Sequence, residues 1–160
     1  MIDNKYWDAD SVVPGKGDGP LCILDEALSF WGGYDAEAGH IIEARHPQFG
    51  ITLAGTTLLM ARAKGSSSSS SVLAEAIRNG TGPAAIIMRE RDLIVALGCI
   101  VASELYEADV PIVVVDAVTW ESLSALPAGT RLRVDADEGT EESAGERTAK
   151  QTGRIYASTN

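Results

Sequence analysis

"LAGTTLLMARAKGSSSSSSVLAEAIRNGTGPAAIIM" (residues 53–88) is the stretch that decides the fold class of this chain. It opens with Leu53–Ala61, a run rich in Thr and Leu that predicts a strand. Six serines follow, and after them apolar residues recur at helical spacing until Asn79-Gly80, a typical helix C-cap. Ala84–Met88 then predicts a second, buried strand. The order strand, serine loop, helix, strand is typical of parallel α/β architecture.

The same alternation continues on both sides of this stretch. The remaining predicted elements are strands at Leu21–Leu24 and His40–Ala44, an apolar core helix over Asp92–Tyr106 capped by Asp92, a buried strand at Val110–Val115, a short helix over Thr119–Leu126 and a last strand at Thr130–Val134. Residues 1–20 carry two prolines and three glycines near their end, so they predict irregular chain. We therefore expect an α/β fold with crossover helices.

The bulk composition indicates one domain of 160 residues, 45% of them hydrophobic. A formal net charge of −10 argues against nucleic acid or an anionic membrane as the main partner. The acid is concentrated between Asp135 and Glu146, which predicts a solvated tail. We expect a folded domain over residues 1–135 and an acidic, polar tail over residues 136–160. The sequence leaves open whether "GRIYAS" (residues 153–158) adds a short strand.

The expected location is the cytoplasm. The N-terminus is polar and acidic, unlike a signal peptide, and no apolar run reaches the roughly 18 residues that span a bilayer. Cys22 and Cys99 each lie within an apolar stretch. Buried, reduced thiols are the interpretation that fits a cytoplasmic protein.

The serine run has the position of a ligand loop. A linker joins domains, whereas this run connects a strand to a helix inside one small unit. Such a loop aims free N–H groups of the helix N-terminus at an anion, and Gly65 permits close approach. We also expect one serine to cap the helix. The pattern matches neither a P-loop nor a G-x-G-x-x-G fingerprint, and no G-x-S-x-G elbow is present.

Three motifs in this order point to a known family: "LSFWGG" (residues 28–33), "KGSSSSS" followed by "VLAEAI" (residues 64–77), and "GPAAII" (residues 82–87). Over roughly residues 19–116 the chain resembles the small subunit of the aconitase X family. The resemblance implies a compact, swivelling β/β/α domain that closes over a large catalytic subunit carrying an iron–sulfur cluster. It also implies that Ser66 is the base that removes a proton beside a carboxylate, while Ser67 and Ser68 hold the substrate carboxylate or enolate oxygen.

The substrate implied by the resemblance is a small hydroxy acid. Classical aconitases place an arginine after their serines, and more serines stand there here, which argues against a tricarboxylate. Bacterial family members resemble cis-3-hydroxy-L-proline dehydratases, our preferred interpretation. Dehydration of mevalonate 5-phosphate and a non-catalytic anion-binding or assembly module remain the alternatives. In the preferred mechanism, cluster iron on the partner acts as a Lewis acid on the leaving hydroxyl. Two cysteines are too few for a cluster, so no metal is expected on this chain, which should be inactive alone.

Further residues have two interpretations each. Phe30 and Trp31 form either an apolar wall for the substrate ring or core anchors, with Gly32 permitting close approach and Ser29 as the better polar contact. Lys64 either attracts the substrate carboxylate or is solvated. Arg89 and Arg91 are either exposed charges or partners of an acidic patch on the large subunit. We expect His40 and His46 to lie at the surface or to be locally hydrogen-bonded, and Asp25 and Glu26 to cap a loop.

Overall fold

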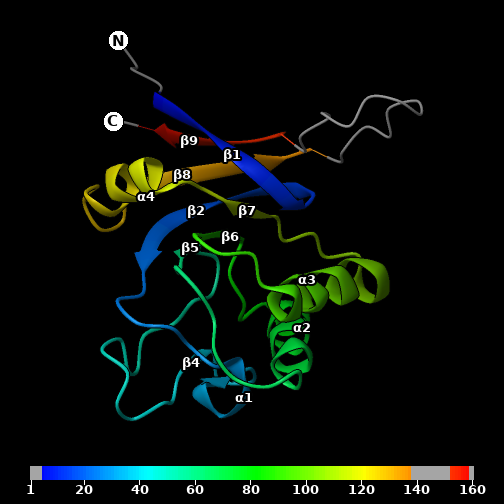
Figure 1. Cartoon of the computed structure of the whole chain (residues 1–160). Helices are drawn as coiled ribbons and strands as arrows, with labels where there is room; N and C mark the ends of the chain where they lie inside the picture. Colours follow the sequence, from blue (N-terminus) through cyan, green and yellow to red (C-terminus); the bar gives the residue numbers. More distant parts are fainter. Residues whose placement is uncertain (1–4, 138–151, 159–160) are drawn as a thin grey trace.

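Seven strands close into a barrel in the computed structural model, which describes residues 5–137 and 152–158 (Figure 1). The strands are β1 (Lys5–Val13), β2 (Gly15–Ile23), β5 (Thr57–Leu59), β6 (Ala85–Met88), β7 (Ile112–Val114), β8 (Arg131–Ala136) and β9 (Thr152–Ser158). Their order around the barrel is β1-β7-β6-β5-β2-β8-β9, and β9 pairs with β1 to close it. Closure removes the free sheet edges that would otherwise invite pairing with another chain.

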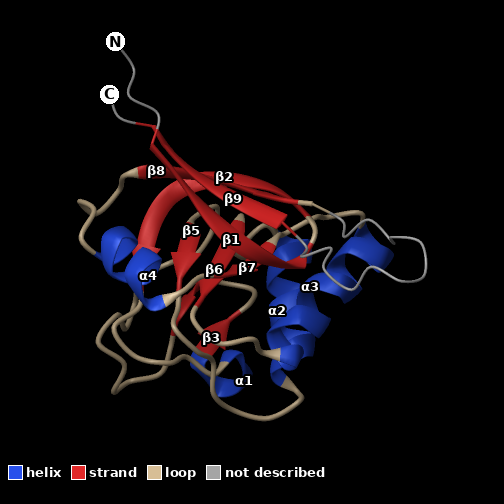
Figure 2. Cartoon of the chain, turned by 45° about the horizontal axis from the view of Figure 1, so that its top comes forward, coloured by secondary structure: helices blue, strands red, loops and turns tan. Residues whose placement is uncertain are grey.

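The parallel half of the barrel, β2-β5-β6-β7, is the α/β unit that the sequence predicts. Its crossover helices, α2 (Ser69–Asn79) and α3 (Leu93–Tyr106), pack together on one side of the barrel, while α4 (Ala117–Ser124) lies on the other (Figure 2). A short helical segment α1 (Phe30–Gly33) and the two-stranded sheet of β3 (Tyr34–Asp35) and β4 (His40–Ile41) precede β5. The predicted α/β class is confirmed.

Alternation along the parallel strands divides the apolar residues between two cores. Leu58 and Ile86 belong to the core that includes α2 and α3, whereas their neighbours Leu59 and Ile87 belong to the barrel interior. All four side chains are fully buried. Because strands buried on both faces need apolar residues at every position, these segments read as continuous apolar runs in the sequence.

The expectation of irregular chain over residues 1–20 is wrong, because β1 and β2 occupy most of it. The glycines of β2 serve close packing. A Cβ on Gly17 would collide with the backbone of Ala84, and one on Gly19 with the backbone of Gly55. Glycine inside a strand marks such close backbone approach as often as it marks a break.

The domain boundary at residue 135 is also wrong. β8 continues to Ala136, and residues 152–158 form β9, which pairs with β1 and β8. Ile155 and Ala157 point into the barrel core, so the last strand is part of the domain. Gly153, Ile155 and Ala157 alternate with Arg154 and Tyr156 along this strand, and the acidic composition before it masks the signal. Residues 138–151, most of the predicted acidic tail, lie outside the described part.

Local signals placed the helices well. Gly80 ends α2 in the left-handed conformation (φ 76°), and the Asp92 side chain accepts hydrogen bonds from the N–H groups of Ile94 and Val95. The predicted strand over residues 40–44 is reduced to His40–Ile41, and the "LSFWGG" motif leads through α1 into β3. The helix expected at 119–126 begins two residues earlier, after its cap Asp116. In the described part, no helix is long and apolar enough to cross a membrane.

Candidate functional site

The serine loop leaves the carboxyl end of β5 and leads into α2, on the edge where the parallel strands end (Figure 1). Ser66, Ser67 and Ser68 are exposed. In α/β folds, ligands commonly bind at the carboxyl ends of parallel strands, and the parallel half of this barrel presents the serine loop there. The position predicted for a ligand loop is therefore the position that the fold provides.

Three consecutive backbone amides of the loop are available to a ligand. The first amides of α2 are used internally: Ser69 N donates to Ser66 O (3.0 Å), Ser70 N to Ser67 O (3.2 Å) and Ser71 N to Ser68 O (3.2 Å). Among the described residues, the N–H and hydroxyl groups of Ser66, Ser67 and Ser68 have no protein partner. The free donors therefore lie one turn earlier than a regular helix N-terminus would place them.

Serine capping of α2 differs from the expectation. Ser68 occupies the cap position, but its side chain makes no capping hydrogen bond, and its φ and ψ (−63° and −19°) are helical. The turn is held by Ser70 Oγ, which donates to Ser67 O (2.8 Å). Among the described residues, α2 therefore makes no hydrogen bond with the hydroxyls of Ser66, Ser67 and Ser68.

Two of the sequence motifs meet at this loop. Trp31 N donates to Ser69 Oγ (3.2 Å), and Lys64 N donates to Leu28 O (3.3 Å). Gly65 adopts φ +108°, and a Cβ at this position would collide with Ser29 Oγ. The "LSFWGG" and "KGSSSSS" motifs are therefore locked together by backbone contacts that only glycine permits at residue 65.

The aromatic pair of "LSFWGG" is split between two environments. Phe30 is only 1% exposed and stands edge-on to Tyr34 (ring centroids 6.0 Å apart), so its predicted role as a wall for the substrate is wrong. Trp31 is 60% exposed beside the serine loop, and Gly32 has open space around its α-carbon. Ser29 Oγ donates to Trp31 O (2.9 Å), which stiffens the turn that carries the indole.

Two cations near the loop, Lys64 and Arg89, are engaged within the chain. Lys64 Nζ lies 3.2 Å from Glu43 Oε2, and Arg89 Nη1 donates to Val115 O (2.7 Å). Arg91 is exposed. A polar cleft of about 670 Å³ opens on the same edge; its lining includes Asp25, Glu26, Arg62, Lys64, Arg89 and Trp120. Sequence reasoning missed this cleft because its walls come from four separate segments of the chain.

His46 is held by local hydrogen bonds and is not free to activate a serine. His46 is buried, and its Nδ1 accepts a hydrogen bond from Gln48 N (3.0 Å), so its Nε2 carries the proton and donates to Glu26 O (3.1 Å). The local-bonding interpretation is therefore confirmed for His46, and His40 lies half-buried in β4. Asp25 Oδ2 accepts from Gln48 Nε2 (2.8 Å), which ties the same loop to the end of β2.

The thiols are poor ligands in this fold. Burial raises the pKa of Cys99 to about 12 and raises that of the half-buried Cys22 as well, and both cysteines are free. A metal or cluster requires the deprotonated thiolate. Within residues 5–137 and 152–158, no group of three or more Asp, Glu, His or Cys side chains is arranged to hold a metal ion. The described residues therefore do not fit an iron–sulfur cluster.

The chain is similar to relatives of two kinds. The chain is 41% identical over 117 residues to a cis-3-hydroxy-L-proline dehydratase of Pseudomonas aeruginosa, covering 73% of this chain and 20% of that protein. It is 37% identical over 132 residues to a phosphomevalonate dehydratase small subunit of Methanothermobacter thermautotrophicus, covering 82% of this chain and 95% of that one. The chain thus spans about a fifth of the length of the hydroxyproline dehydratases that it matches.

Solved structures and family models agree with these sequences. A crystal structure of Thermococcus kodakaraensis aconitase X in its holo form superposes with a TM-score of 0.72 at 29% identity, covering 96% of this chain and 98% of that one. The model of the aconitase X swivel domain matches residues 6–142, including the serine loop and both motifs beside it. The chain belongs to the aconitase X swivel domain family.

Proposed function

We propose that this chain is the swivelling part of a hydro-lyase that dehydrates cis-3-hydroxy-L-proline to pyrroline-2-carboxylate. The observation that carries the proposal is the serine loop itself. It presents an exposed Ser66 hydroxyl beside amides that have no partner among the described residues, at the edge where the parallel strands end. The names of the relatives supply the reaction class, since both kinds are dehydratases.

Ser66 is the base in this mechanism. Its alkoxide takes the proton from C2 of the substrate, the C3–O bond breaks, and the hydroxyl leaves as water once it has gained a proton. The new C2=C3 enamine then tautomerises to the imine. A serine hydroxyl ionises only where its anion is stabilised, and the N–H groups of Ser67 and Ser68 face no competing protein acceptor among the described residues.

Ser67 and Ser68 have a second role in orienting the substrate. Their hydroxyls are free donors directly after the base, so they can bind the carboxylate attached to C2. Negative charge moves into this carboxylate as the C2–H bond breaks, and fixed donors stabilise it most at that point. We place Ser29 behind the loop as a positioning residue and Trp31 as the exposed apolar wall; Gly32, with φ +77°, allows the turn directly after Trp31.

A partner chain must complete the site. The serine loop is open to solvent, and its nearest ammonium group, on Lys64, is paired with Glu43. The resemblance to aconitase X implies that a large subunit carries an iron–sulfur cluster, whose Lewis acidity would assist departure of the substrate hydroxyl. Because the cysteines of this chain do not fit the cluster, we assign it to the partner and derive no step through it.

Dehydration of mevalonate 5-phosphate is the second candidate, and one observation favours it. The chain covers nearly the whole of the phosphomevalonate dehydratase small subunits, whereas it covers only a fifth of the hydroxyproline dehydratases. The identity is higher to the Pseudomonas hydroxyproline dehydratase, 41% against 37%. The short run of serines offers no cation for a phosphate, which supports the smaller substrate.

The test is turnover by this chain copurified with its large partner, on each of the two substrates. Ser66→Ala is compared with Ser71→Ala, an exposed serine of the same run whose amide is already used in α2. We expect turnover of cis-3-hydroxy-L-proline that Ser66→Ala abolishes and Ser71→Ala retains. Turnover of mevalonate 5-phosphate alone would establish the second candidate. Ligand binding without turnover of either substrate would identify a non-catalytic binding module.

A further inference from the structure

The outer face of α3 carries an apolar stripe that nothing in the described chain covers. Leu93, Leu97 and Ile100 follow one another at helical spacing and are 81%, 48% and 45% exposed. The sequence predicts a helix buried on all sides, because α3 is apolar nearly all round. Such a helix is normally buried by protein on every side, so the stripe indicates a missing neighbour.

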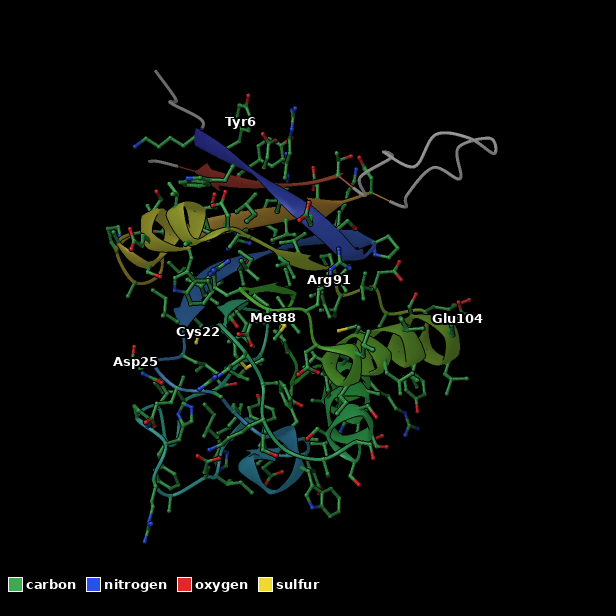
Figure 3. The ribbon with its side chains drawn as sticks, in the orientation of Figure 1. Tyr6, Cys22, Asp25, Met88, Arg91 and Glu104 are labelled. Atoms are coloured by element: carbon green, nitrogen blue, oxygen red, sulfur yellow. The ribbon has the colours of Figure 1, made fainter. Side chains whose placement is uncertain are left out.

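The stripe is continuous with the serine site. A Cβ on Gly98 of α3 would lie only 2.9 Å from Ser70 O, so the middle of α3 packs directly against the first turn of α2. Half-buried Ile94 and Val101 occupy the helix face between Gly98 and Leu97. The apolar surface therefore runs from the serine loop across α3 to the stripe. Figure 3 marks the extent of this helix, with Arg91 ahead of its start and Glu104 near its end.

We propose that the α3 stripe is the docking surface for the larger part of the enzyme, the chain that completes the serine site. The inference rests on the proposed function, which requires that partner. Relatives that hold this domain within one polypeptide are about five times its matched length, so a large body must lie against it. The occupant presents an apolar surface, since burying Leu and Ile against charged groups would leave those groups without partners.

A second copy of this chain fits the stripe less well. Each copy carries a formal net charge of −10, and like charges oppose association when they are brought together. A dimer through α3 would also cover the surface beside Ser70 and obstruct the approach to the serine loop. The larger partner fits better, because it covers the stripe and reaches the serine site from the same side.

The test uses Leu93→Glu and Leu97→Glu in the chain coexpressed with its large partner, with binding measured in the absence of substrate. Leu93 is the first residue of α3, where a carboxylate suits the helix dipole, so that variant is expected to fold normally. Val118→Glu is the control, because Val118 is 75% exposed on α4, across the barrel from α3 (Figure 2). Thermal unfolding of each isolated variant verifies the fold.

We expect each α3 variant to bind the partner at least about 30-fold more weakly than the parent, while Val118→Glu and Ser66→Ala bind as the parent does. Unchanged binding by both α3 variants would overturn the proposal. So would a dimer of the isolated chain that Leu97→Glu dissociates, because that would make a second copy the occupant. Since binding is measured without turnover, an inactive parent complex would refute the proposed function and leave the docking result intact.

Discussion

Gly65→Ala should destabilise the protein by about 2–6 kcal/mol, because two separate costs act at this position. An alanine at φ +108° is strained by about 1–3 kcal/mol. Its Cβ would also collide with Ser29 Oγ and lie 3.0 Å from Ser29 Cβ and 3.2 Å from Ser69 Oγ, and overpacking of this kind costs about 1–3 kcal/mol more. A chain of this length would lose about 10 °C in Tm.

Gly129→Ala separates the two costs. Gly129 also has a positive φ (+83°), but a Cβ added there would meet no other part of the described structure within 4 Å, so alanine at this position is strained without a collision. We expect a loss of about 1–2 kcal/mol. Urea unfolding followed by circular dichroism measures both variants on the same scale.

A double-mutant cycle with Ser29→Gly identifies the neighbour that causes the difference. Removing the Ser29 side chain frees the space next to residue 65, so Gly65→Ala should cost little more in that background than Gly129→Ala costs in the parent. The reasoning is refuted if Gly65→Ala is no more destabilising than Gly129→Ala. It is also refuted if the cost of Gly65→Ala is unchanged by Ser29→Gly, because the close approach of the two motifs would then contribute nothing.

Three further predictions follow from the fold. Truncation after Asp137 should prevent cooperative unfolding, because it removes β9 and opens the barrel; a truncated chain with the parent's Tm would contradict this. Asp116→Ala should lower stability at neutral pH, because the Thr119 backbone N–H lowers the pKa of the Asp116 carboxyl; the difference should vanish as the pH falls through that depressed pKa, as acid titration of Tm would reveal. Cys99 should resist a thiol-specific reagent at pH 8 in the folded chain and react in urea, because burial raises its pKa to about 12, and rapid labelling of folded protein would be inconsistent with that burial.

The parallel half of the fold could be predicted from the sequence because its signals are local. Continuous apolar runs marked the strands, and Gly80 and Asp92 marked helix ends through their own backbone and side-chain chemistry. In the antiparallel half, β8 was predicted, β1 and the first part of β2 were missed and β9 was left open, because the missing signals are non-local. The glycines of β2 look like breakers until Ala84 and Gly55 are seen packed against them. The apolar residues of β9 are buried only by strands far away in the sequence.

The candidate site was predictable in its loop but not in its surroundings. Serines between a strand and a helix pointed to Ser66–Ser68, whereas the contact of Gly65 with Ser29 depends on the tertiary fold. No sequence pattern distinguishes the buried Phe30 from the exposed Trp31, because they are adjacent aromatics in a turn. The exposed face of α3 was missed because its sequence is apolar nearly all round, which is typical of a fully buried helix.

Release of deuterium from C2 of cis-3-hydroxy-L-proline tests the central claim, that Ser66 removes this proton, most directly. The measurement follows C2-deuterated substrate in the complex of this chain with its large partner, for the parent, Ser66→Ala and Ser71→Ala. The account predicts release by the parent and Ser71→Ala, and none above background by Ser66→Ala in an intact complex. Release at the parent rate by Ser66→Ala would contradict it and assign the base to another residue.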